Sequence, residues 1–139
     1  MEKVDFSLLT PGMTSAPFIQ DALTAWSYDG SGVLQAKYVI VSQDSVIGYR
    51  CPEKTRVLLP TDANKVQLAV FAPDRVRIQG LDINMDASGN PATVSASANV
   101  QLVTLTVNGL RAVELECNTE AILVWIEWEP APKKQRRNR

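Results

Sequence analysis

The sequence predicts an all-β protein that folds as a two-sheet β-sandwich, with the jelly roll as the preferred topology. From Val33 onward, runs rich in β-branched or alternating apolar residues follow one another along the chain. Turn-forming residues separate these runs, and no window keeps a helical period. Short strands at a spacing of roughly 8–12 residues with turns between them are typical of sandwiches, jelly rolls and partly closed barrels.

The expected strands number about nine, and in chain order they are VLQAKYVIVS, SVIGYR, TRVLL, KVQLAVFA, RVRIQGL, ATVSASA, VQLVTLTV, RAVELEC and AILVWIEWE. Two of them alternate cleanly between apolar and polar residues. The apolar positions of these two strands are Val66, Leu68, Val70, Val113, Leu115 and Cys117. Such alternation predicts that one side of the strand is buried and the other faces solvent.

Asn108-Gly109 is the strongest turn signal in the chain, because this dipeptide suits a two-residue type I′ turn. It predicts a hairpin between residues 102–107 and residues 110–116. The last strand, residues 121–128, is apolar at both sets of alternate positions. This pattern predicts a strand that is covered on both sides or that contacts another subunit.

A single folded domain is expected, because 139 residues with 45% hydrophobic content suffice for one core. Residues 1–30 hold prolines and glycines among short apolar groups without a sustained period, which predicts an extended N-terminal arm. Residues 31–130 are expected to form the β-sandwich domain. Pro130 and Pro132 end strand pairing, so residues 131–139 are expected to be a flexible tail.

Charge is divided unevenly between the body and this tail. The formal net charge is −1, from 14 basic and 15 acidic residues. Five basic residues lie in the last seven positions, which leaves nine basic against 15 acidic residues, a net charge of −6, in residues 1–132. The body offers no basic stripe for nucleic acid, so the tail is expected to contact an acidic protein surface. Its cations are Lys133, Lys134, Arg136, Arg137 and Arg139.

The chain contains no histidine, which removes the commonest general base and the commonest metal ligand. The nucleophile, zincin, phosphate-loop and dinucleotide strings GxSxG, HExxH, Walker A and GxGxxG are also absent. We therefore expect no enzymatic activity, no catalytic residue and no cofactor. Glu114 and Glu116 are interpreted as a solvent-facing stripe, although a glycosidase-like pair of acids stays open.

Two further features are interpreted as structural. Cys51 and Cys117 belong to no CxxC pair and are expected to be semi-buried thiols, with a disulfide left open because sequence does not test its geometry. Residues 82–89 begin like a calcium loop, with oxygen ligands at alternate positions. Ala87 stands where the loop needs glycine and Thr93 where it needs glutamate, so a polar turn and no metal site are expected.

The tryptophans suit either of two uses. With Tyr28, they would suit the aromatic platform of a sugar-binding sandwich, or else the core and a subunit contact. Trp125 and Trp128 are three positions apart and point to opposite sides of a regular strand. One of the two is therefore expected in the core and the other nearer the surface, and core plus subunit contact is the preferred interpretation.

The arm is too apolar for a free terminus and too irregular for an independent fold. We expect part of it to pack on a neighbouring subunit or on a partner. Together with the tail cations, the candidate contact residues are Phe6, Leu8, Leu9, Phe18, Ile19, Trp26 and Trp128.

An extended arm, a strand-rich body of about a hundred residues without histidine, and a basic tail together resemble the cementing, or decoration, proteins of tailed bacteriophage capsids. The likeness is to the jelly-roll cement proteins of short-tailed phages, and it covers most of the chain. It implies a non-enzymatic virion protein, synthesised in the host cytoplasm, that stabilises the outer capsid surface. The implied partner is the major capsid protein, whose subunits it would bridge as a homo-oligomer, a dimer or a trimer.

The alternative is a carbohydrate-binding or receptor-binding β-sandwich module, such as part of a tail fibre, which predicts exposed aromatic residues with amides nearby. No apolar stretch approaches the roughly 20 residues needed to span a bilayer, so no membrane contact is expected. Residues 1–13 lack the apolar run of a signal peptide, so export by that route is not expected. Nucleic acid is not an expected partner.

Overall fold

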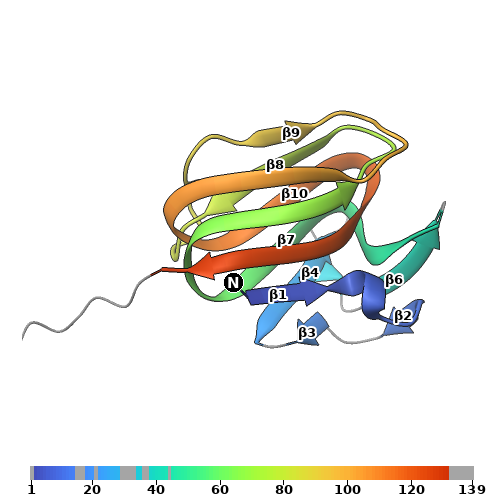
Figure 1. Ribbon diagram of the computed structural model, residues 1–139, viewed down its shortest axis with the longest axis horizontal. Helices are drawn as coiled ribbons and strands as arrows, with labels where there is room; N and C mark the ends of the chain where they lie inside the picture. Colours follow the sequence, from blue (N-terminus) through green and yellow to red (C-terminus); the bar gives the residue numbers. More distant parts are fainter. Residues whose placement is uncertain are drawn as a thin grey trace, which may run out of the picture.

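The computed structural model describes residues 2–14, 18–20, 22–28, 34–35, 38–43 and 45–131. In this part of the chain every strand pair is antiparallel, and one short 3-10 helix, η1 (Phe6–Leu8), is the only helical element. This confirms the all-β prediction (Figure 1). The strands are β1 (Glu2–Asp5), β2 (Gly12–Thr14), β3 (Phe18–Gln20), β4 (Leu23–Tyr28), β5 (Leu34–Gln35), β6 (Tyr38–Gln43), β7 (Val46–Phe71), β8 (Val76–Leu81), β9 (Ala92–Val94) and β10 (Gln101–Pro130).

Two long, bent strands carry the architecture. β7 has 26 residues and β10 has 30, and the two pair with each other along most of their length. Residues 101–106 of β10 pair with residues 65–70 of β7, and residues 112–116 pair with residues 54–58. The pairing is irregular between these two ladders, where both strands bend. Each long strand therefore takes part in two layers.

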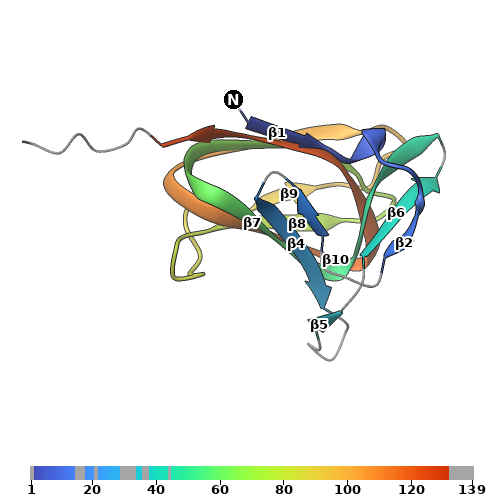
Figure 2. The ribbon, with the colours of Figure 1, turned by 90° about the horizontal axis from the view of Figure 1, so that it is seen from below.

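We call these layers sheet A and sheet B. Sheet A consists, in order, of β1, residues 123–130 of β10, residues 63–70 of β7 and residues 101–106 of β10. Sheet B consists, in order, of β3 and β5 at its edge, β4, residues 54–58 of β7, residues 112–117 of β10, β8 and β9. Figure 2 shows the long strands curving from one layer into the other. The fold is the predicted two-layer β-sandwich, and it is jelly-roll-like.

The hairpin expected at Asn108-Gly109 is not formed, so this prediction was wrong. Residues 102–107 and 110–116 do not pair with each other, because both pair with β7, in sheet A and in sheet B respectively. Gly109, with a φ of 79°, lies at the bend between these two ladders. Its left-handed backbone, which glycine adopts without a steric penalty, turns a single strand from one sheet into the other.

The core lies between the sheets, and it follows the alternation of the sequence. Val66, Leu68 and Val70 of sheet A and Val113 and Leu115 of sheet B are completely buried. Burial of such aliphatic side chains contributes roughly 1.5–3 kcal/mol each, which makes this interior the main source of stability.

The described segments of the first thirty residues pair with the rest of the fold and do not extend away from it as an arm. β1 pairs with β10 at the edge of sheet A, and β4 pairs with β7 in sheet B. Phe6 and Phe18 are 0% and 3% exposed. Their ring centroids lie 4.9 Å apart, and both rings pack on Tyr49. Phe6 and Phe18, which were expected to contact a partner, are instead covered by the chain itself.

The calcium-like loop is organised by its own hydrogen bonds. Oδ1 of Asp82 accepts from the backbone N–H groups of Asn84 and Asp86 at 2.9 and 3.1 Å. Met85 adopts a positive φ of 63° between them. This is the polar turn that was expected, because the aspartate replaces backbone partners at the tip of the loop.

In the described ranges, no helix is long and apolar enough to cross a membrane.

Candidate functional site: the outward side of sheet B

The outward side of sheet B carries a band of charged and aromatic residues. Alternate residues of its strands, such as Thr55 and Val57 in β7, are buried, so their neighbours point away from the core. The antiparallel register places these outward residues side by side across the strands. We call this set the sheet B face, and it consists of Trp26, Lys54, Arg56, Arg77, Gln79, Thr93, Glu114 and Glu116.

Ion pairs hold the centre of the sheet B face. Nε and Nη2 of Arg56 donate to Oε2 of Glu114 at 3.1 and 2.6 Å. Nζ of Lys54 lies 3.5 Å from Oε1 of Glu114 and 4.0 Å from Oε2 of Glu116. Both oxygens of Glu114 therefore meet a cation, and its side chain is only 15% exposed. Charge-assisted contacts of this kind fix the geometry of both partners.

An aromatic side chain stands beside this pair. Trp26 of β4 lies opposite Arg56 in the register and is half-buried. Neighbouring strands are about 4.8 Å apart, so the indole and the guanidinium begin from adjacent positions on the face. An indole offers a broad apolar surface with a single N–H donor. The face thus combines an apolar surface, strong donors and strong acceptors in adjacent strands.

Gln79 anchors the other end of the same row to the loop after β8. Its Nε2 donates to the carbonyl oxygens of Gly80 and Gly89 at 3.1 and 3.2 Å, and the side chain is buried. These bonds fix the edge of the sheet B face, because a buried amide with satisfied partners has one preferred orientation.

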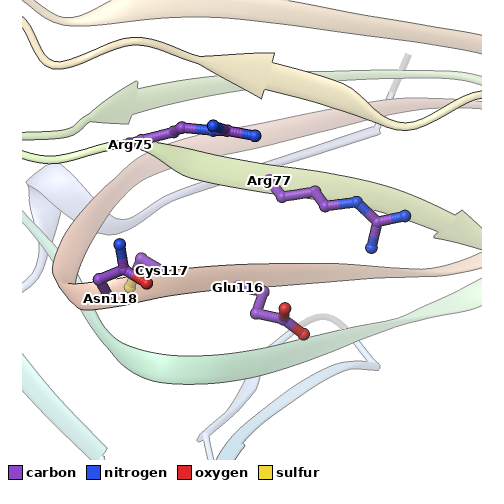
Figure 3. A pocket seen from close by; sticks show the side chains of 5 residues that line it. All are labelled: Arg75, Arg77, Glu116, Cys117 and Asn118. Atoms are coloured by element: carbon purple, nitrogen blue, oxygen red, sulfur yellow. The ribbon is translucent and has the colours of Figure 1, made fainter.

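The face continues into an open hollow of about 250 Å³ (Figure 3). Arg77 belongs to β8, and Arg75 precedes that strand by one position, so the two residues share one side of the chain. Figure 3 shows both side chains extending in the same direction. The hollow presents two guanidinium groups, a carboxylate, an amide and a thiol, from Arg75, Arg77, Glu116, Asn118 and Cys117.

The thiol in this hollow is protonated at neutral pH. Burial, reinforced by the negative charges of Glu120 and Asp74, raises the pKa of Cys117 from 9.0 to about 11. Its Sγ donates to the carbonyl oxygen of Cys51 at 3.4 Å. Burial likewise raises the pKa of Cys51 to about 12, and both cysteines are free. Because the thiolate is the reactive form, neither residue suits nucleophilic chemistry near pH 7.

The residues proposed from sequence as partner contacts fall into several groups. Phe6, Phe18 and Trp128 are at most 3% exposed, which corrects the expectation for them, because a side chain enclosed by its own fold cannot contact another molecule. Leu8 and Ile19 are 82% and 68% exposed.

Two other predicted contact residues have different positions. Leu9 packs partly against the core, and Trp26 lies on the sheet B face. The tail cations Lys133, Lys134, Arg136, Arg137 and Arg139 lie outside the described residues.

Of the two tryptophans in the last strand, Trp128 is in the core and Trp125 is the outward one. Nζ of Lys3 lies 4.5 Å from the centroid of the Trp125 ring, across the β1–β10 pair. The prediction that one ring is buried and the other is nearer the surface is confirmed. Trp128 was assigned to the contact surface, but its side of the strand faces sheet B.

Sequence reasoning missed most of the sheet B face. The alternation of Arg75 and Arg77 with apolar residues was a usable signal for an outward pair. Glu114 and Glu116 do share the outward side of one strand, as predicted, and the structure adds their cationic partners, Lys54 and Arg56. In the part of the chain that the structure describes, no group of three or more acidic or cysteine side chains is placed to hold a metal ion.

No protein-family model matches the sequence, and no curated protein matches it. Solved structures resemble it at low similarity. The module CsCBM6-3 from Clostridium stercorarium, in complex with cellobiose, is 13% identical over 94% of each chain, with a TM-score of 0.45. The carbohydrate-binding module CBM36, in complex with calcium and xylotriose, is 12% identical over 93% of this chain and 100% of that one, with a TM-score of 0.40. A family two carbohydrate esterase from Cellvibrio japonicus is 14% identical over 98% of this chain and 37% of its own, with a TM-score of 0.42. At these values the likeness does not bear on what this chain binds.

Proposed function

We propose that the protein binds carbohydrate through the sheet B face and does not turn its ligand over. The observation that carries the proposal is the position of Trp26 beside the Arg56–Glu114 pair on an outward sheet surface. Sugar rings pack an apolar C–H side on aromatic rings, and their hydroxyl groups both donate and accept hydrogen bonds. Guanidinium groups only donate and carboxylates only accept, so an adjacent pair satisfies neighbouring hydroxyl groups.

Preorganisation supports the same proposal. Arg56 and Glu114 hold each other at 2.6 Å, and Lys54 holds the second oxygen of Glu114. Side chains that are already ordered lose little conformational entropy when a ligand binds. The face is therefore suited to a polar, hydroxyl-rich ligand, because its hydrogen-bonding groups are already ordered before the ligand binds.

The same contacts favour binding over catalysis. Glu114 is ion-paired through both oxygens, which leaves it poorly placed to move a proton. The two thiols are protonated, because their pKa values are raised to about 11 and about 12. We therefore infer a non-enzymatic module, for which prolonged incubation with bound oligosaccharides releases no new reducing ends.

The capsid hypothesis stays a prediction, together with its major capsid protein partner, its homo-oligomer and its virion location. Three of its proposed apolar anchors, Phe6, Phe18 and Trp128, lie in the core. This removes three of the anchors expected for a cementing contact, whereas Leu8 and Ile19 remain exposed.

Titration with a panel of neutral and acidic oligosaccharides tests the proposal, read by calorimetry or by affinity electrophoresis. Trp26→Ala is expected to weaken binding by about tenfold or more, as removal of a central aromatic contact does. Trp125→Ala is the matched control, because Trp125 is also half-buried and outward but lies in sheet A. Binding that is lost in Trp125→Ala and retained in Trp26→Ala would assign the ligand to the other sheet.

A further inference from the structure

The arginines of the hollow differ from most cations of the described chain. Five basic side chains have partners within that chain, whereas Arg75 and Arg77 have neither an ion pair within 4.0 Å nor a hydrogen bond from their guanidinium groups there. The partnered contacts are Arg50–Glu120, Lys54–Glu114, Arg56–Glu114, Arg111–Asp62 and Lys3 over Trp125.

The nearest carboxylate in the register does not satisfy them. Glu116 lies opposite Arg77, but its Oε2 is 4.0 Å from Nζ of Lys54, on the opposite neighbouring strand. In Figure 3 the Glu116 carboxylate and the Arg77 guanidinium stand apart. Arg75 and Arg77 therefore extend side by side, with like charges and unused donors, over a hollow. An anion bound there would relieve the repulsion and use both sets of donors.

We propose that this hollow binds the carboxylate of an acidic sugar, so that the glycan recognised by the sheet B face contains a uronic acid. The inference rests on the proposed function and names its ligand class. A carboxylate is planar, and a guanidinium fork donates to it through two parallel N–H groups. The amide of Asn118, on the wall of the same hollow, supplies a donor and an acceptor for an adjacent hydroxyl group.

Acidic residues near the two arginines moderate the positive charge of the hollow. Besides the two arginines, the hollow contains Glu116, and the charges of Asp74 and Glu120 reach the adjacent Cys117. These acids offset much of the positive potential of the arginines. A sugar carboxylate gains the two guanidinium forks through its planar geometry, and the neighbouring acids lower the electrostatic gain of any anion bound there.

Matched pairs of glycans test the inference. Oligogalacturonate, glucuronoxylan and alginate oligosaccharides are compared with their carboxyl-reduced forms, which keep the backbone and lose the charge. At least one acidic form is expected to bind about tenfold tighter than its reduced counterpart. Arg75→Gln and Arg77→Gln are each expected to remove most of that preference, and Arg77→Lys is expected to restore only part of it, because lysine lacks the fork. Lys65→Gln, a cation of sheet A without a partner in the described chain, is the control and should leave the preference intact.

The outcomes separate the inference from the proposed function. Equal affinity for acidic and reduced glycans, with binding still dependent on Trp26, would overturn the inference and leave the proposed function standing. Absence of binding to every glycan would overturn both. Tighter binding of sulfated oligosaccharides, or competition by inorganic phosphate or acetate at concentrations near that of the glycan, would overturn the assignment of the site to a sugar carboxylate.

Discussion

Nη2 of Arg56 lies 2.6 Å from Oε2 of Glu114, and this contact joins the two long strands at the middle of sheet B. Both side chains are less than one quarter exposed. The contact therefore combines a structural role in the sheet with the polar character of its outward face.

Removal of one partner of this pair should destabilise the protein measurably. Arg56→Ala leaves a poorly hydrated Glu114 carboxylate with Lys54 alone, so we expect a loss of about 1–3 kcal/mol in the free energy of unfolding. Urea denaturation measures it. The comparison pair is Arg50–Glu120, whose side chains are 43% and 31% exposed, and Arg50→Ala should cost at most about 1 kcal/mol. Equal losses would show that burial does not distinguish the two pairs.

The N-terminal segment should matter for folding before it matters for any assembly. Phe6 is fully buried against Phe18 and Tyr49, so Phe6→Ala is expected to lower the free energy of unfolding by about 3–5 kcal/mol. Leu8→Ala, two positions on, should change it by less than about 0.5 kcal/mol, because Leu8 is 82% exposed. Thermal and urea unfolding of the two variants provide the measurement. A stable Phe6→Ala protein that fails only in oligomerisation would restore the interpretation of this segment as an arm.

The two thiols predict a loss of stability at alkaline pH. Their pKa values in the folded chain, about 12 for Cys51 and about 11 for Cys117, lie above the ordinary value of 9.0. The folded state therefore holds its thiol protons more tightly than the unfolded state does. Their contribution is complete below about pH 9 and declines as the pH rises through the folded values.

Unfolding free energies measured between about pH 8 and pH 11 test this sign. Tyrosines and lysines also titrate in this range, so the relevant quantity is the difference between the native chain and Cys51→Ala or Cys117→Ala. Each variant should show a shallower decline than the native chain. An unchanged slope in both variants would contradict the raised pKa values.

The close packing of Gly80 against Leu110, which lies at the bend of β10, can be tested. A Cβ atom on this residue would lie 2.5 Å from Cδ2 of Leu110, whose side chain is fully buried. Gly80→Ala is therefore expected to cost about 1–3 kcal/mol, as overpacking does in a dense core. In the double variant Gly80→Ala with Leu110→Ala, the new methyl group fills part of the vacated space. The stability losses of the two single variants should therefore sum to more than the loss measured for the double variant. Strict additivity would show that the two positions do not share this space.

Local patterns identified the buried sides of the strands but not the path between them. Val66 and Leu68 face inward as predicted, because a period of two is intrinsic to an extended chain. Asn108-Gly109 marks a local bend, yet nothing local decides whether the flanking strands pair with each other or with a third. Here the competing partner is β7, whose paired residues lie more than 30 positions earlier in the chain.

For the candidate site, too, local patterns predict which side chains share a side of a strand but not which partners they meet. The parity of Trp125 and Trp128 predicts that one ring is buried and one is nearer the surface, but which ring is buried depends on the position of sheet B. In the same way, the spacing of Arg75 and Arg77 predicts that both side chains lie on the same side of a strand. The absence of a carboxylate partner follows only from the register with β10, in which the side chain of Glu116 reaches Lys54 instead.

The bent pairing of β7 with β10 also determines how the chain must fold. Each ladder of this pair joins residues far apart in sequence, such as Gln101 with Val70 and Ala121 with Cys51. Neither sheet can be completed before these two segments meet, so the entropy of closing long loops must be lost early. Refolding should be slow, on the millisecond-to-second scale typical of topologies with high contact order, and stopped-flow fluorescence of the three tryptophans would measure it. The feature that makes the two layers one continuous unit is thus also the main kinetic barrier to forming them.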